Sequence, residues 1–405
     1  MNKLTYRHTI IACFMAYVVQ SMVINYVPLL FVQFQNEFSV DLVQITALVS
    51  LNFLVQLMAD ALSIPIIKRI GYRWVAILAH LLAVLGFAAM ALLPNMISSN
   101  PYIGLVIATA LYSAGGGLIE VVSNPILEEI PTDNNERMMS LMHSFYSWGF
   151  VAVTIIAMSY FYFVGIEQWR VLTFFWCIIP LLNMILFIFV PLPTIIEGTA
   201  EGGSMMGLLT NQAFWIFSVM MFCAGASEMA LSQWLSLYME KTVGFSKAVG
   251  DLAGPLSFAV MMGLFRLYFG LGKHNLSIIK FIMISLITLT ISILVMSIFN
   301  WPWISLLGSA LYGGAVGILW PGTYSLAGKG LTGGPIMFGM LALIGDLGCT
   351  VGPGLIGQVA AWSGGNLRVG IFSSIIFPLI FFWMIYLTKK KSLFEGKNEA
   401  AVIKE

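Results

Sequence analysis

Ionisable side chains inside apolar segments are the residues of this sequence that could do chemistry. Four of them, Glu120, His143, Glu228 and Asp346, each lie within a long run of apolar residues. A charged side chain at the centre of a bilayer costs about 2.5 to 3.5 kcal/mol on insertion scales, so each one is a candidate functional residue. Carboxyl groups and imidazole rings can take up and release protons. We therefore expect these four residues to be the candidates for proton coupling.

Glu120 and Asn124 form the strongest candidate binding motif. Their spacing of four residues places both side chains on one face of a helix, and Gly116 and Gly117 clear space one turn earlier. A carboxylate there can accept hydrogen bonds from substrate hydroxyls when it is charged, and it can bind a proton when it is buried. One residue would then couple substrate binding to proton binding. The alternative is a hydrogen bond between helices with no role in transport.

Two further groups of residues extend the predicted site. Glu228 is followed by Gln233 and Trp234, which would supply polar contacts and an aromatic plate for a sugar ring. The alternative for this group is packing, or a place at the membrane interface, where Trp is common. Asp346 lies among glycines that allow close helix packing, and either binds substrate or a proton or makes a structural polar contact. His143 is either a pH-linked switch or a hydrated side chain near the end of its helix.

Uncharged polar residues line two other apolar segments. Gln20 and Asn25 are cheaper to bury than charges, and they either line a cavity or bond neighbouring helices. Asn52, Gln56 and Asp60 recur every four residues and form one polar stripe along a helix. The stripe is a candidate cavity wall or gate, with Asp60 as the candidate gating residue.

The composition indicates that membrane-spanning segments position these side chains. The chain has 405 residues, 59% hydrophobic and 9% charged, whereas a soluble domain is about a quarter charged. A spanning helix needs about 20 apolar residues, and twelve such segments are centred near residues 20, 53, 84, 112, 150, 180, 225, 258, 288, 314, 347 and 378. We therefore predict an all-α membrane protein with twelve transmembrane helices. The net charge of +1 does not favour a nucleic-acid partner.

The distribution of basic residues predicts the orientation. With both termini inside, only Arg170, Lys241, Lys247 and Arg368 of the 19 Lys and Arg residues fall in outside loops. Because Lys and Arg concentrate in cytoplasmic loops, we expect a multi-pass protein of the plasma (cytoplasmic or cell inner) membrane with cytoplasmic N- and C-termini.

The chain also divides into two similar halves. Residues 1–190 and 212–390 are each expected to form a six-helix bundle, joined by a cytoplasmic linker at 191–211 and followed by a cytoplasmic tail at 391–405. The run Ala110-Leu-Tyr112 with Gly117 reappears as Ala310-Leu-Tyr312 with Gly317, at an offset of 200. Such repeats predict a transporter in which one bundle moves against the other around a central site.

A basic turn gives the first resemblance to a known family. The stretch Ile66-Ile-Lys-Arg-Ile-Gly-Tyr-Arg73 resembles the turn between helices 2 and 3 of major facilitator proteins, and Gly263-Leu-Phe-Arg266 resembles its counterpart in the second half. The acidic residue usual in that turn is absent, and Asp60 is the candidate substitute. The resemblance implies gating roles for Arg69, Arg73 and Arg266.

A second resemblance is narrower. Glu120-Val-Val-Ser-Asn124-Pro125, followed by His143-Ser-Phe-Tyr-Ser-Trp-Gly149, is similar to the signature of the fucose permease branch of that superfamily. The resemblance implies uptake of a monosaccharide together with protons, by alternating access.

The energy source follows from what the sequence lacks. No phosphate-binding loop is present, so an ion gradient must drive transport, with the proton as the expected coupling ion and sodium as the alternative. No cofactor, metal ligand set or catalytic residue is expected. The 24 Met and 29 Phe residues could instead form the plastic pocket of a drug or metabolite exporter. An intramembrane enzyme is the remote alternative, since no nucleophile and base pair is found. The short loops favour a monomer.

Overall fold

The computed structural model describes residues 4–131, 135–193, 205–270, 277–331 and 334–390, and the described residues form helices and connecting turns, without strands. The predicted tail, 391–405, and residues 194–204 of the predicted linker lie outside the described residues. The first half of the chain contains α1 (Tyr6–Asn25), η1 (Val27–Leu30), α2 (Phe31–Phe38), α3 (Leu42–Met96), α4 (Pro101–Glu129), α5 (Asn135–Phe163), η2 (Ile166–Gln168), α6 (Trp169–Trp176) and α7 (Ile178–Phe189).

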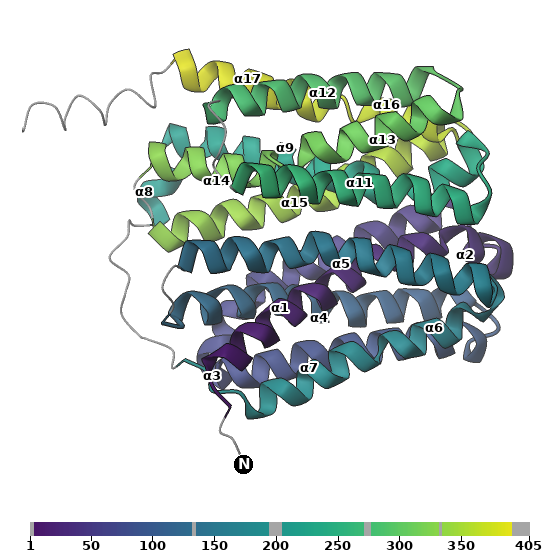
Figure 1. The fold of residues 1–405 in the computed structure, drawn as a ribbon, viewed down its shortest axis with the longest axis horizontal. Helices are drawn as coiled ribbons and strands as arrows, with labels where there is room; N and C mark the ends of the chain where they lie inside the picture. The colour runs from purple at the N-terminus through teal and green to yellow at the C-terminus, as the bar shows by residue number, and fades with distance from the viewer. Residues whose placement is uncertain (1–3, 132–134, 194–204, 271–276, 332–333, 391–405) are drawn as a thin grey trace, which may run out of the picture.

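The second half repeats this arrangement after the short helix α8 (Met205–Leu209), which falls inside the predicted linker. Its elements are α9 (Gln212–Ser232), α10 (Leu235–Leu237), η3 (Tyr238–Val243), α11 (Lys247–Gly270), α12 (Ile278–Ile298), α13 (Pro302–Val316), α14 (Leu319–Gly330), α15 (Gly334–Trp362), α16 (Leu367–Ser373) and α17 (Ile376–Lys390). In Figure 1 the purple and blue helices of the first half and the green and yellow helices of the second form two stacked bundles.

The apolar lengths of the helices confirm the predicted all-helical membrane fold. Eleven helical stretches of the described chain are long and apolar enough to cross a membrane, and a shorter one covers Ala253–Tyr268. Helix α3 contributes two of the eleven, Leu42–Leu62 and Arg69–Met96. The two arms meet at Gly71, whose φ of 78° is favourable for glycine and strained for other residues. The predicted count of twelve is consistent with this architecture.

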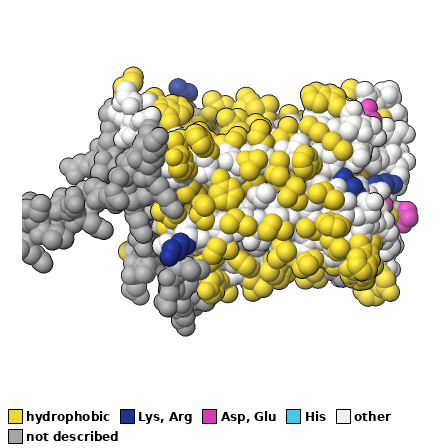
Figure 2. All heavy atoms as spheres, turned by 90° about the horizontal axis from the view of Figure 1, so that it is seen from above, with side chains coloured by type: hydrophobic (Ala, Val, Ile, Leu, Met, Phe, Trp, Pro, Cys, Tyr) yellow, Lys and Arg dark blue, Asp and Glu magenta, His cyan; other side chains and the backbone are white. Residues whose placement is uncertain are grey.

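The outer surface suits lipid rather than water. Figure 2 shows hydrophobic side chains covering the long side of the molecule, with charged side chains toward its ends. Large apolar side chains are strongly exposed there, among them Phe163 and Trp362. The chain is therefore a multi-pass membrane protein.

We call the end of the bundle where α1 begins and α17 finishes the terminal end, and the opposite end, where α2 lies, the distal end (Figure 1). Each half carries an arginine near the distal end, as the second residue of a helix. Arg170 of α6 donates a hydrogen bond to Asn95, and Arg368 of α16 donates one to the carbonyl of Phe299. Each arginine thereby fastens its helix to the end of the third span of its own half. The two halves therefore repeat in structure as well as in sequence.

Glycines bring α9 and α15 into backbone contact. A methyl group added at Gly348 would overlap the carbonyl oxygen of Phe222, and one at Gly352 would overlap that of Ala226. Such small residues let helices in a membrane approach closely and gain van der Waals contact. The pair α9 and α15 is therefore held in one register.

Candidate functional site

Glu120 is held within the first half by the side-chain amide of Gln20. Its Oε2 accepts a hydrogen bond of 3.1 Å from Nε2 of Gln20 on α1, and the same nitrogen donates to Oε1 of Gln56 on α3 at 2.9 Å. A Cβ at Gly116 would lie 3.0 Å from Gln20 Oε1, so this glycine gives the amide its space. Glu120 is half-buried and Gln20 is 2% exposed. The predicted pairing of a carboxylate with neighbouring polar residues is therefore present in the geometry.

The amide network continues along the polar stripe of α3. Gln56 Nε2 donates to Oδ1 of Asn52 at 3.0 Å, and the Ser113 hydroxyl donates to the same oxygen at 2.6 Å. Asn52 and Gln56 were expected as a cavity wall, and Ser113 was not predicted. The four-residue spacing of Asn52 and Gln56 placed them on one face of their helix, whereas a lone serine in an apolar run gives no such signal.

Asn124 and His143 are joined through a tyrosine that sequence reasoning missed. The hydroxyl of Tyr17 on α1 donates to Asn124 Oδ1 at 2.9 Å, and the Tyr17 ring meets the His143 ring edge to face, with centroids 4.9 Å apart. Tyr17 is buried, whereas His143 is exposed and Asn124 is half-buried. Tyr17 therefore fixes the orientation of Asn124, and His143 reaches solvent.

Asp60 and Asp346 meet across the two halves. The side chains of Asp60 on α3 and Asp346 on α15 are neighbours across the two halves, and the charge of Glu120 acts on both carboxyl groups. Both aspartates are half-buried. The residue predicted as a gate and one predicted as a binding residue thus form one pair.

Glu228 is paired with Arg266 in a geometry that the sequence did not indicate. The terminal nitrogen Nη2 of Arg266 on α11 donates to both Glu228 oxygens at 2.8 and 2.7 Å, and Nη1 donates to the Ser147 hydroxyl of α5 at 3.1 Å. Placing Arg266 in a loop after the eighth span was wrong, because α11 continues to Gly270. Its guanidinium neutralises the Glu228 carboxylate inside the protein and contacts the opposite half.

Three other predicted binding residues are fully buried in packing contacts. Trp234 is 0% exposed and donates from Nε1 to the carbonyl of Pro353 at 2.9 Å. Gln233 donates to the Ile24 carbonyl at 3.4 Å, and Asn25 of α1 donates to the Tyr146 hydroxyl of α5 at 3.3 Å. In this conformation these side chains hold helices together, and no face of Trp234 is open to a sugar.

In the basic turn, residues Ile66 to Arg73, the side chain of Arg73 bonds to the end of α7 within the first half. Arg73 donates to the carbonyls of Phe187, Ile188 and Val190, at 2.8, 2.5 and 3.0 Å. These are the otherwise unpaired carbonyls at the end of α7, which a cation satisfies well. Arg69 is exposed at the terminal end. The described contacts of Arg73 therefore fall within the first half.

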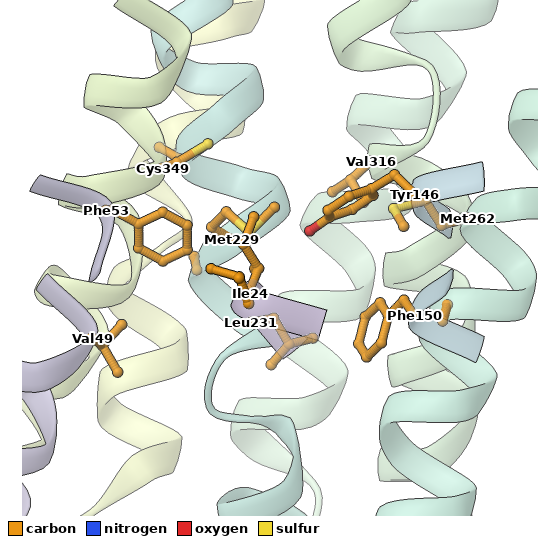
Figure 3. Close-up of a cluster of buried hydrophobic side chains, with 14 of the residues drawn as sticks. Ile24, Val49, Phe53, Tyr146, Phe150, Met229, Leu231, Met262, Val316 and Cys349 are labelled. Carbon is orange, nitrogen blue, oxygen red and sulfur yellow. The ribbon is translucent and has the colours of Figure 1, made fainter. Parts of the chain in front are cut away.

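Apolar side chains separate the polar groups from the distal end. Helix α3 starts at the distal end, and Val49 and Phe53 precede Asp60 along it. Figure 3 shows that Phe53 points toward Met229 of α9 and lies beside Ile24 of α1. Further toward that end, the rings of Phe31 and Trp234 lie 6.0 Å apart, across the two halves. The partly exposed Glu120, Asp60, Asp346 and His143 thus lie on the terminal side of an apolar layer.

These features define a class of protein: a helical membrane protein of two bundles with polar and ionisable groups between them. A family model described as the Major Facilitator Superfamily matches residues 9–353. The chain belongs to the Major Facilitator Superfamily, and it is therefore a membrane transporter of small molecules rather than an enzyme.

Solved structures of similar fold include several transporters. A variant of the E. coli fucose:proton symporter is 15% identical, with a TM-score of 0.64 over 94% of this chain and 98% of that one. A D-xylose-proton symporter is 13% identical, with a TM-score of 0.78 over 93% and 97%. A variant of the nucleoside transporter NupG is 14% identical, with a TM-score of 0.71 over 96% and 99%. No curated protein sequence matches.

Proposed function

We propose that this protein takes up a monosaccharide together with protons across the cytoplasmic membrane, by alternating access between its two halves. The observation that carries the proposal is the half-buried carboxylate of Glu120, which accepts a hydrogen bond from the amide of Gln20 and lies on the same helix as Asn124. Gln20, Asn124 and Glu120 together offer both donors and acceptors, as a hydroxyl-rich ligand requires.

The charges of the site favour an uncharged substrate over an anion. Asp60, Glu120, Asp346 and Glu228 are acidic, and the guanidinium of Arg266 is already bound to Glu228. An organic anion would meet like charges at the centre of the protein and would be repelled at low dielectric. A neutral sugar would meet hydrogen-bonding groups and no such repulsion.

A proton gradient supplies enough energy for accumulation. One proton moving through 100 mV releases about 2.3 kcal/mol, and a factor of ten in concentration corresponds to about 1.4 kcal/mol. Glu120, Glu228, Asp346 and His143 are the proton candidates, and sodium is the alternative coupling ion. With the termini in the cytoplasm, the apolar layer at the distal end would lie toward the outer side of the membrane.

Liposomes containing the purified protein test the proposal. We would record internal pH while adding hexoses, deoxyhexoses, pentoses, disaccharides and nucleosides in turn, for the native protein and for Glu120→Gln. Nucleosides are included because of the similarity to a nucleoside transporter. We expect one sugar class to drive proton entry, and the Glu120→Gln response to fall at least about tenfold.

Glu167→Gln is the matched control, because Glu167 is an exposed glutamate of the short helix η2, and its response should equal that of the native protein. No response of the native protein to any compound, with or without sodium, would contradict sugar transport. The drug or metabolite exporter would then be the leading hypothesis, to be tested by drug susceptibility of expressing cells.

A further inference from the structure

One buried oxygen atom beside Glu120 lacks a hydrogen bond. Gln20 is 2% exposed, and its Oε1 has no partner among the described residues, whereas Nε2 of the same amide donates to Glu120 at 3.1 Å and to Gln56 at 2.9 Å. Resting on the proposed function, we propose that this oxygen accepts a hydrogen bond from one hydroxyl group of the substrate, and that Gln56 and Asn52 are the residues that position it. The site then selects a sugar by a hydroxyl that donates at one position of the ring.

The energetic argument is the cost of the unpaired acceptor. A buried polar atom that gives up its bonds to water and gains none in return keeps the full penalty of its desolvation. Most buried side-chain acceptors in proteins therefore have a partner, and one without a partner calls for an explanation. A substrate hydroxyl that donates to Oε1 removes the penalty. Binding is favoured because the protein has already desolvated the atom that the substrate meets.

The orientation of the Gln20 amide follows from a chain of amides that begins at a main-chain carbonyl. Nε2 of Gln56 lies 3.5 Å from the main-chain oxygen of Asn52 and donates to Oδ1 of the same residue at 3.0 Å. A main-chain carbonyl can only accept, so the nitrogen of Gln56 faces Asn52 and its oxygen faces Gln20. That oxygen in turn requires a donor from Gln20, which is Nε2.

Two further groups hold the chain of amides in the same sense. The hydroxyl of Ser113 on α4 donates to Oδ1 of Asn52 at 2.6 Å, and both residues are buried. At the other end, the carboxylate of Glu120 can only accept, so it also requires Nε2 of Gln20. Turning the Gln20 amide would place Oε1 against two acceptors, those of Glu120 and Gln56. The network therefore leaves Oε1 as the atom of this amide that a substrate can bond.

A glycine keeps other side chains away from this oxygen. A Cβ added at Gly116 of α4 would lie 3.0 Å from Gln20 Oε1 and 2.8 Å from Cγ1 of Val23. Gly116 and the half-buried Glu120 are four residues apart and share one face of α4. A ligand at Glu120 is thus on the side of the helix where the acceptor lies. Oε1 itself is enclosed in the conformation described, so the proposal requires that another stage of alternating access uncovers it.

Chemical replacement of a hydroxyl tests its role as a donor. A hydroxyl group has one hydrogen to donate and two lone pairs that accept. Hydrogen in its place removes donor and acceptor alike, whereas fluorine removes the donor and retains lone pairs. At the position that bonds to Gln20 Oε1, both replacements should therefore weaken binding. At a position where the hydroxyl only accepts, the fluorinated sugar should be tolerated better than the deoxy sugar.

Competition for uptake into liposomes measures this preference. The probes are labelled D-glucose, D-galactose, D-xylose and fucose, and the competitors are the unlabelled parent sugars with their monodeoxy and monodeoxyfluoro analogues. The measured quantity is the concentration of competitor that halves the uptake of the labelled sugar. We call the ratio of this concentration for an analogue to that for its parent the discrimination. In the native protein we expect one ring position at which both analogues show a discrimination of at least about tenfold.

Two variants connect that position to the amide. Gln20→Leu removes the acceptor, so the discrimination there should fall to about twofold or less. In Gln56→Leu the Gln20 amide loses one of its two partners and can turn, so the discrimination should fall to an intermediate value, while other ring positions keep theirs. Gln33→Leu is the matched control, because the Gln33 amide donates to Glu37 of its own helix α2 at the distal end. Its discrimination should equal that of the native protein.

Each outcome decides the inference. A folded Gln20→Leu with native discrimination would overturn it, as would a native protein that carries a sugar and discriminates at no hydroxyl, because water would then satisfy Oε1. Fluorinated analogues that compete as well as the parent would overturn it too, because the hydroxyl would then accept. If Gln20→Leu elutes abnormally or carries no sugar, unchanged discrimination in Gln56→Leu overturns the inference. A native protein that carries none of the sugars would defeat the proposed function and the inference with it.

Discussion

The two interfaces between the halves carry polar bridges of opposite character. Between α3 and α15, an acid meets an acid, Asp60 with Asp346. Between α5 and α11, the guanidinium of Arg266 donates to Ser147 and is held by Glu228. The second and eighth spans occupy equivalent places in the two halves, as do the fifth and eleventh, so the bridges are counterparts of each other. One brings two acidic side chains together and the other contains its own counter-charge, so equivalent places in the two halves carry contacts of opposite electrostatic character.

The largest expected effect comes from breaking the charged bridge. Arg266→Gln leaves the Glu228 carboxylate unpaired in a buried setting, and removing one partner of a buried pair is destabilising by about 3 kcal/mol. The free energy of unfolding in detergent, followed by denaturant titration, measures this loss. Adding Glu228→Gln should restore much of it, because no uncompensated charge remains. An Arg266→Gln protein as stable as the native one would contradict the pairing.

The fold followed from the sequence because lipid makes strong demands on it. Backbone groups in a bilayer must be bonded within the segment, so the length of each apolar run predicts a helix. The eighth span shows where this reasoning weakens. Its apolar stretch is the short Ala253–Tyr268, and the basic residue near its end resembled a loop residue. Arg266 is nevertheless inside α11, because its charge has a partner on another helix.

A medium effect is expected from the hydroxyl that receives the Arg266 hydrogen bond. Ser147→Ala removes the acceptor of this contact between halves, and a hydrogen bond to a charged group contributes about 1.5 kcal/mol. Ser144→Ala is the matched control, because the Ser144 hydroxyl donates to the Leu141 carbonyl of its own helix. The same unfolding titration should show a loss for Ser147→Ala that exceeds the loss for Ser144→Ala. Equal losses would mean that the bridge at α5 and α11 does not hold the halves together.

The smallest effect is expected at the acid pair near neutral pH. Asp60→Asn replaces one of two neighbouring acidic groups with a neutral amide of similar size, so the free energy of unfolding should change by less than about 1 kcal/mol. The contrast should grow with pH. Raising the pH favours ionisation of both carboxyl groups in the native protein, and the repulsion between two like charges then lowers its stability relative to Asp60→Asn. A difference that stays constant from acid to alkaline pH would contradict repulsion between the two carboxyl groups.

Which residues belong to the site could be predicted from the sequence, whereas which of them contact one another mostly could not. Glu120 and Asn124 could be placed on one face because the spacing lies within one helix. The partners of Glu228 and Asp346 come from other helices, and a single sequence contains no information on which helix faces which. Trp234 shows the same limit, since a tryptophan beside a glutamine fits a sugar platform as well as a packed core. Only its contacts with Pro353 and Phe31 decide between these interpretations in this conformation.

The glycine contacts between α9 and α15 determine how the two interfaces between the halves can open. Helix α15 carries Asp346 at one interface, and α9 carries Glu228, which holds Arg266 at the other. Because the backbones of these two helices touch at Gly348 and Gly352, they behave as a single rigid arm with one bridge on each side. A displacement that opens one interface must shift the other in the same stroke. Partly opened forms, with one interface closed and the other open, are therefore disfavoured by the close approach of the backbones at two glycines.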